Sequence, residues 1–211
     1  MIFRSTVYCT VLATMLVCTG ASFDPSLTET EVVEAQDQPK AAEDYAKPLL
    51  DLIAKHEGDY NSVNRGYAGD TPGGIQSLTG LTFDQYTVGE VIDMQHSNLG
   101  AVGRYQMIRT TLEFAVDNSD VDRSDMFTPS TQDKLVMALI MHKRPAIGSY
   151  LLGEHDDIDS AVYEMAREWA SMEYRNGYGY YDGFSGNKAH ITRTELSAVL
   201  KKVRSGWQAN G

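Results

Sequence analysis

Cysteine is almost absent from this chain, since Cys9 and Cys18 both lie within its first 18 residues. The rest of the sequence therefore offers no disulfide, zinc–thiolate site or thiol nucleophile. Positive charge is scarce as well: 18 Lys and Arg stand against 29 Asp and Glu, for a formal net charge of −11. Nucleic-acid affinity comes largely from cations on phosphates, so we expect no nucleic-acid partner.

The overall composition excludes two further classes of protein. Hydrophobic residues make up 42% of the chain and charged residues 22%, as in soluble globular proteins. Such a chain is neither wholly disordered nor a multi-span membrane protein. No nucleophile elbow, Walker loop or metal-ligand spacing of histidines is present, and Tyr60 stands where a His56-Glu-x-x-His zinc motif needs its second histidine. We therefore expect neither a metal nor a cofactor.

The N-terminal segment has the pattern of a signal peptide. Arg4 supplies a positive charge, residues 5–23 carry none, and Thr19-Gly20-Ala21 offers small residues for a signal peptidase. We predict that residues 1–21 are cleaved and that the protein is exported to the periplasm or cell envelope. The alternative is a retained membrane anchor, because the uncharged run is close to the minimum length of a membrane span.

The remaining chain divides into an acidic stretch and a domain. Residues 22–45 carry seven acidic side chains against Lys40 alone, and few apolar ones, which predicts a disordered linker. Residues 46–207 are predicted to form a mainly α domain of two lobes, one of them Gly-rich with at most a small β-hairpin at 58–86. Caps and apolar periodicity predict helices at 48–57, 88–96, 110–116, 129–143, 145–152, 158–172 and 193–204.

One carboxyl stands out at the boundary between a helix and the Gly-rich segment. His56-Glu57-Gly58 ends the first predicted helix. The negative end of the helix dipole and partial burial both disfavour a charged carboxyl there and raise its pKa. A general acid that works near neutral pH needs such a pKa. Glu57 is therefore a candidate catalytic acid, and the alternative is an ordinary exposed residue at a helix end.

Several short motifs resemble one enzyme family. Gly103-Arg104-Tyr105-Gln106 resembles an element of the phage lambda endolysin-type lytic transglycosylases, which belong to the lysozyme-like superfamily. The His-Glu-Gly that precedes a Gly-rich loop resembles the opening of lysozyme-like domains. Three further stretches keep the order of the family's motifs: residues 127–133, 169–172 and 177–179. The resemblance covers about residues 49–204.

The resemblance implies an α+β lysozyme-like fold with a saccharide groove between two lobes. It implies cleavage of the β-1,4 bond between N-acetylmuramic acid and N-acetylglucosamine in peptidoglycan glycan strands. We expect the protein to be a monomer. Glu57 matches the catalytic acid; Tyr105 and Gln106 match groove-lining residues, and Arg104 and Tyr178 are further candidates for substrate binding. The N-terminal segment departs from the family, which leaves a phage lysis enzyme, a virion or secretion-linked enzyme and a cellular wall remodeller open.

The spacing of carboxylates bears on the type of reaction. Glycoside hydrolysis generally uses two carboxylates. Phage lysozymes commonly place an aspartate nine residues after the glutamate, where this chain has Gly66; Asp59 and Asp70 lack that spacing. One carboxyl suffices if the C6 hydroxyl of the muramic acid attacks its own anomeric carbon. We therefore predict a lytic transglycosylase that forms 1,6-anhydromuramic acid; the alternatives are a hydrolytic muramidase and a non-catalytic wall-binding module.

Overall fold

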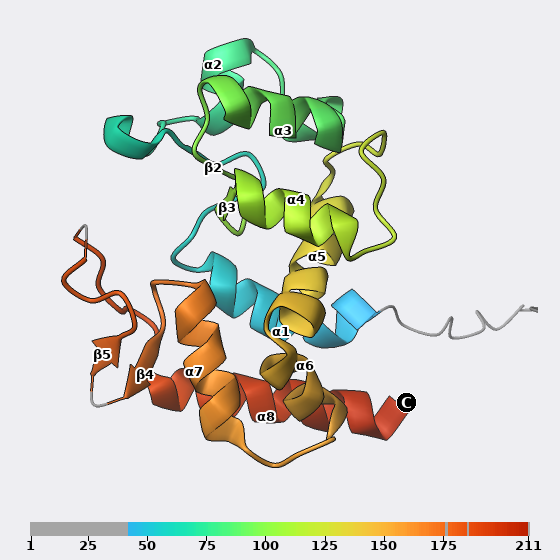
Figure 1. Ribbon diagram of the computed structural model, residues 1–211, viewed down its shortest axis with the longest axis vertical. Helices are drawn as coiled ribbons and strands as arrows, with labels where there is room; N and C mark the ends of the chain where they lie inside the picture. The colour runs from blue at the N-terminus through green and yellow to red at the C-terminus, as the bar shows by residue number, and fades with distance from the viewer. Residues whose placement is uncertain (1–41, 176, 185, 211) are drawn as a thin grey trace, which may run out of the picture. The chain divides into compact units, whose positions relative to one another are not determined.

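The computed structural model describes residues 42–175, 177–184 and 186–210 (Figure 1). These residues belong to one compact unit, Pro39–Gly211. The predicted signal peptide, residues 1–21, and residues 22–41 of the predicted linker lie outside the described ranges. Within those ranges, no helix combines the length and apolar character that crossing a bilayer requires.

Helices dominate the described chain, which confirms the mainly α prediction. The α-helices are α1 (Ala42–Ala54), α2 (Gly74–Thr79), α3 (Val88–Ser97), α4 (Arg109–Asp117), α5 (Pro129–Ala138), α6 (Pro145–Leu152), α7 (Ile158–Glu168) and α8 (Arg193–Asn210). Two short 3-10 helices, η1 (Gly66–Ala68) and η2 (Phe83–Gln85), flank α2, and a π-helical segment, η3 (Leu139–Lys143), follows α5 directly.

Two small antiparallel sheets complete the fold. Strands β1 (Val63–Asn64), β2 (Ala101–Val102) and β3 (Met107–Ile108) form one sheet in the order β1-β2-β3. Strands β4 (Glu173–Arg175) and β5 (Tyr178–Gly179) form the other. Helix α1 packs against α5 and α8, while α6 packs against α7 and α8 (Figure 1). Buried apolar side chains from these helices belong to one hydrophobic core.

Local capping explains why several predicted helices begin where they do. The Thr87 side chain accepts a hydrogen bond from the backbone N–H of Glu90, whose carboxylate accepts the Thr87 N–H, as expected of a capping box. Thr128 caps α5 ahead of a proline in its first turn, and Asp157 caps α7. These helix starts follow from residues within four positions of each other.

The Gly-rich stretch is more ordered than predicted. It contains helix α2, and β1 pairs with β2, which lies nearly forty residues further along the chain, rather than forming a hairpin within the stretch. Ile75 is fully buried and thus anchors α2. Gly74 has φ +59 and lies against the backbone of Asn61, where a Cβ would come within 2.0 Å of the carbonyl oxygen. The glycine here permits close packing rather than a flexible loop.

The first helix begins earlier than predicted. Helix α1 starts at Ala42, so residues 42–45 of the predicted linker are helical, and Pro48 lies inside the helix rather than in its first turn. Ala46 and Leu49 are fully buried. Packing of this face against the core outweighs the local preference of proline for a helix start.

Candidate functional site

A pocket of about 400 Å³ opens beside Glu57. Its walls come from the turn after α1, the segment from the β2–β3 turn to α4, the π-helical η3, the end of α7 and the loop after β5. A larger cavity of about 880 Å³ lies over α2 and α3, but its carboxylates, Glu90 and Asp93, are exposed. Burial is what perturbs the chemistry of a carboxyl, so the smaller pocket is the candidate site.

Glu57 has the protonation behaviour expected of a general acid. Its side chain is half-buried in the turn that follows α1, and loss of solvation raises its pKa to about 7. A hydrogen bond from Ser171 Oγ to Glu57 Oε1, 2.7 Å long, partly opposes that rise because it stabilises the carboxylate. Near neutral pH the carboxyl therefore exists in both forms, as the sequence-based hypothesis requires.

Ser171 reaches Glu57 because α7 ends sooner than predicted. The helix stops at Glu168, and Trp169 has extended dihedrals. The backbone carbonyl of Ser171 then accepts hydrogen bonds from the N–H groups of His190 and Ile191. These contacts direct the chain away from the helical path and hold the Ser171 side chain, which is only 7% exposed, against Glu57.

Ser171→Ala is expected to raise the pKa of Glu57 further above about 7. The substitution removes the hydroxyl that stabilises the charged carboxylate and adds no compensating donor. NMR titration of the Glu57 side-chain carboxyl measures the change directly. Ser205→Ala removes a hydroxyl exposed on α8 and is the matched control, with no expected effect on that titration. A Glu57 titration that does not move in Ser171→Ala would show that this hydrogen bond does not stabilise the carboxylate.

Two separated sequence motifs meet next to the pocket. Gly103, with φ +73, begins the turn between β2 and β3, and a Cβ there would come within 2.4 Å of Gln132 Oε1. That oxygen of the fully buried Gln132 accepts the backbone N–H of Arg104 at 3.0 Å. The Gly-Arg-Tyr-Gln turn and the start of α5 therefore interlock, and only glycine fits at the point of contact.

Gln106 borders the pocket with a strained backbone. Its φ of +48 is the only positive value at a non-glycine residue in the part of the chain that the structure describes. Its side-chain amide donates to the Gly103 carbonyl at 2.9 Å, which closes the turn and fixes the amide beside the pocket. Strain of this kind accumulates at functional sites, where the surroundings hold one conformation.

Tyr105 borders the pocket with its ring only. It is 2% exposed, and its hydroxyl donates to Asp133 Oδ1 at 2.5 Å. Burial and this carboxylate raise the pKa of the phenol well above its ordinary value. Because the hydroxyl is bonded within the fold, Tyr105 shapes the pocket wall with its ring and offers no hydrogen bond to a ligand.

Arg104 and Tyr178 lie outside the lining of the pocket. The Arg104 guanidinium donates to Asp51 Oδ1 at 2.6 Å and to the hydroxyls of Tyr60 and Tyr105, so it joins α1 to the β2–β3 turn. Tyr178, in β5, is 63% exposed. The structure therefore brings Glu57, Tyr105 and Gln106 together but not the other two predicted site residues: Arg104 is held by contacts with α1, and the Tyr178 side chain is largely exposed outside the pocket.

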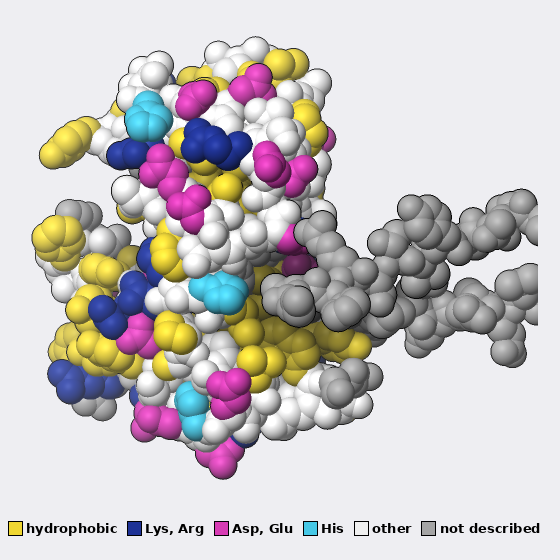
Figure 2. Space-filling view, turned by 45° about the vertical axis from the view of Figure 1, so that its right-hand side comes forward, with side chains coloured by type: hydrophobic (Ala, Val, Ile, Leu, Met, Phe, Trp, Pro, Cys, Tyr) yellow, Lys and Arg dark blue, Asp and Glu magenta, His cyan; other side chains and the backbone are white. Residues whose placement is uncertain are grey.

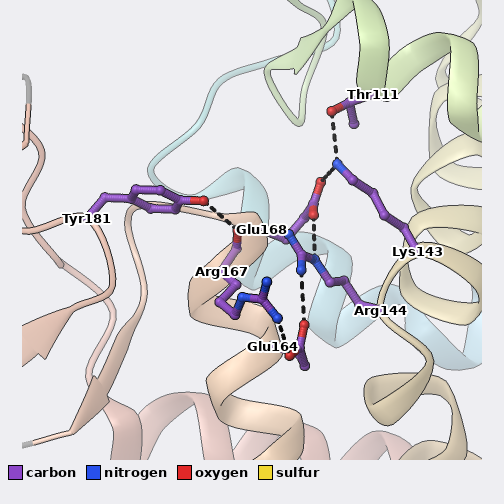
Figure 3. A network of polar contacts seen from close by, with 7 residues as sticks. All are labelled: Thr111, Lys143, Arg144, Glu164, Arg167, Glu168 and Tyr181. Atoms are coloured by element: carbon purple, nitrogen blue, oxygen red, sulfur yellow. Dashed lines mark hydrogen bonds and ion pairs between the residues drawn. The ribbon is translucent and has the colours of Figure 1, made fainter.

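The sequence did not reveal an ionic network that forms one wall of the pocket (Figure 3). Glu168 Oε1 accepts from Lys143 Nζ at 2.6 Å, and its Oε2 accepts from Arg144 Nε at 2.7 Å. Glu164 accepts from Arg144 at 3.0 Å and from Arg167 at 2.7 Å. The sequence signal available was the acidic pair Glu164 and Glu168, one helical turn apart. Arg167 lies close to them in the sequence, but Lys143 and Arg144 lie at least twenty residues before them.

The π-helical segment explains how the cations reach this wall. We predicted a regular buried helix through residue 143, but its last turn widens into η3, and the Arg144 N–H bonds to the Leu139 carbonyl at 2.9 Å. Such a widened turn shifts the side chains that follow relative to a regular α-helix, and π segments are frequent at functional sites. Lys143 and Arg144 consequently face α7 across the pocket wall.

His56, next to Glu57, is of a residue type that often binds metal ions. His56 stacks on His190 with ring centroids 5.3 Å apart. Within residues 42–175, 177–184 and 186–210, no three side chains of His, Cys, Asp or Glu gather where they could hold a metal ion. The pocket presents acid–base and ionic groups.

The sequence model of the Endolysin family matches residues 47–199 of this chain. This span contains Glu57, the turn at Gln106, the ionic network and Ser171. Searches of curated proteins and of solved structures give no match.

Proposed function

The chain belongs to the endolysin family of phage enzymes that degrade the bacterial cell wall, and from this premise we propose that it is a lytic transglycosylase. Its substrate is peptidoglycan, and the proposed scissile bond is the β-1,4 link from N-acetylmuramic acid to N-acetylglucosamine. The observation that carries the proposal is that Glu57, with a pKa of about 7, is the one carboxyl of the pocket without a cationic partner among the described residues.

A single carboxyl performs both proton transfers in this mechanism. Protonated Glu57 gives its proton to the glycosidic oxygen as the bond to the anomeric carbon breaks. The resulting carboxylate then takes the proton of the C6 hydroxyl, whose oxygen bonds to that same carbon. No water is consumed, and Glu57 ends in its starting form. The attacking hydroxyl belongs to the same sugar, so its proximity supplies much of the rate advantage.

Hydrolysis on this site would require a second carboxylate. Glu168 borders the pocket, but its side chain is 5% exposed and each of its oxygens accepts from a cation. Asp59 holds its own turn through Asn61 and Ser62, and neither Asp59 nor Asp70 lines the pocket. Because these carboxylates are bonded within the protein, the C6 hydroxyl of the sugar is favoured over an activated water as the nucleophile. A hydrolytic muramidase would have to use Glu168 as its second carboxylate.

The products of digestion test the proposal. We expect muropeptides with 1,6-anhydromuramic ends, one water lighter than hydrolytic products and resistant to borohydride, when released fragments are analysed by mass spectrometry. Glu168→Gln, assayed per folded molecule, is expected to give the same anhydro ends, because Glu168 takes no part in proton transfer. Reducing ends from the wild-type enzyme, together with an inactive Glu168→Gln variant, would establish the hydrolytic alternative instead.

A further inference from the structure

The charge of the pocket wall is opposite to that of the protein. The chain carries 29 acidic against 18 basic residues. Yet Lys143, Arg144 and Arg167 all border the pocket, and with Glu164 and Glu168 they form a network of three cations and two anions. Figure 2 shows Lys and Arg side chains gathered beside apolar ones on the left of the view. A local positive charge in an acidic protein points to an anionic ligand group.

Stability alone does not explain this network. Replacing half-buried ion pairs by apolar side chains of similar volume is often neutral or stabilising, because desolvation offsets the attraction between the charges. The side chains of Lys143 and Arg144 are 27% and 15% exposed, so they remain open to the pocket while losing much of their hydration. Cations kept in this state bind an incoming anion more strongly than fully hydrated ones do.

The cations of the network have two different roles: one positions the carboxylates, and the other two retain N–H groups for a ligand. Each of the three guanidinium nitrogens of Arg144 has a partner, since they donate to Glu168, to Glu164 and to the Arg167 carbonyl, and Figure 3 shows Arg144 joining the two carboxylates. Lys143 uses two of its three N–H donors, on Glu168 and on Thr111. Arg167 bonds to Glu164 through one terminal nitrogen. Lys143 and Arg167 thus retain donor capacity, and Arg144 positions both of their carboxylate partners.

Arg167 is also held in place from its other side. Its guanidinium carbon lies 5.7 Å from the ring centroid of Tyr163 and 5.8 Å from that of Tyr180. Cation–π contacts and the ion pair to Glu164 together restrict the side chain before any ligand arrives. A donor that is already ordered loses less entropy on binding.

We propose that Lys143 and Arg167 bind a carboxylate carried on the lactyl substituent of the muramic acid residue, an inference that rests on the proposed function. N-acetylmuramic acid differs from N-acetylglucosamine by this substituent, which ends in its own carboxylate or in the acidic stem peptide. The contact distinguishes the two sugars and sets which of them lies beside Glu57. The enzyme therefore prefers strands that carry this negative charge to neutral glycans.

The test measures binding by calorimetry in a Glu57→Gln background, where cleavage is expected to be slower by about two to four powers of ten. Three soluble oligosaccharides of alternating N-acetylglucosamine and N-acetylmuramic acid serve as probes: one with free lactyl carboxylates, one with stem peptides, and one with lactyl methyl esters. Lys143→Gln and Arg167→Gln are each expected to weaken binding of a charged probe by about tenfold or more. Binding of the ester probe is expected to stay the same.

Two control variants separate this contact from general effects. Lys134→Gln removes an exposed cation on α5 that pairs with Asp120, and it is expected to leave all three affinities unchanged. Lys143→Arg keeps the charge and is expected to restore most of the affinity lost in Lys143→Gln, which a mere packing defect would not do. Whichever charged probe responds identifies the lactyl acid or the stem peptide as the source of the carboxylate.

The outcomes distinguish this inference from the proposed function. Equal weakening for the charged and ester probes, or no weakening in either glutamine variant, would overturn the carboxylate contact alone. If the unsubstituted pocket binds none of the three probes, the proposed function fails with it.

Discussion

Glu57→Gln is expected to lower peptidoglycan turnover by about two to four powers of ten, the usual contribution of a general acid. Glutamine keeps the shape of the side chain and the acceptor for Ser171 Oγ but has no titrating proton to give to the glycosidic oxygen. Turbidity loss of purified cell walls measures the rate. Glu154→Gln, at an exposed position after α6, is the control and is expected to retain full activity. Comparable clearing by the two variants would show that another group supplies the proton.

The same carboxyl predicts a dependence on pH. Turnover by the wild-type enzyme is expected to fall as pH rises above about 7, where Glu57 loses its proton. Its folded-state pKa also lies above the ordinary value of 4.5, so the folded protein binds the proton more tightly than the unfolded chain. That stabilisation is complete below about pH 4.5 and is lost as pH rises through about 7. Denaturant unfolding at several pH values should show this loss in the wild type and not in Glu57→Gln.

Glu168→Ala is expected to reduce the free energy of unfolding by about 3–5 kcal/mol, because it leaves Lys143 and Arg144 half-buried without their shared anion. For a domain of this size that corresponds to a fall in melting temperature of roughly 10 °C. Calorimetry or circular dichroism measures the transition. The effect is a large part of the total stability of an ordinary domain.

The control for this prediction is an ion pair of equal length and different burial. Asp156 and Arg204 are 2.6 Å apart, as Glu168 and Lys143 are, but the Asp156 side chain is 96% exposed whereas that of Glu168 is 5% exposed. Asp156→Ala is expected to cost at most about 1 kcal/mol, since water and salt screen exposed pairs. Similar losses in the two variants would mean that the Glu168 network is effectively solvated and contributes little.

Several helix starts and the candidate acid follow from the sequence alone. Thr87 with Glu90, Thr128 before its proline, and Asp157 act on backbone N–H groups within four residues, so their effect is visible without any knowledge of the fold. Glu57 could be singled out because it follows a helix and precedes a Gly-rich segment. The motif order that pointed to the endolysins is also a property of the chain alone.

Features that depend on burial and on partners distant in the sequence became visible only in the folded protein. Ser171 meets Glu57 beyond the early end of α7, where its carbonyl pairs with residues 190 and 191, and Glu168 meets Lys143 where η3 widens the end of the preceding helix. Tyr105 was expected to line a groove; its ring does border the pocket, but only the fold shows that its hydroxyl bonds to Asp133. Local rules reach about one helical turn, whereas desolvation and ion pairing depend on which segments pack together, and that is determined by the whole core.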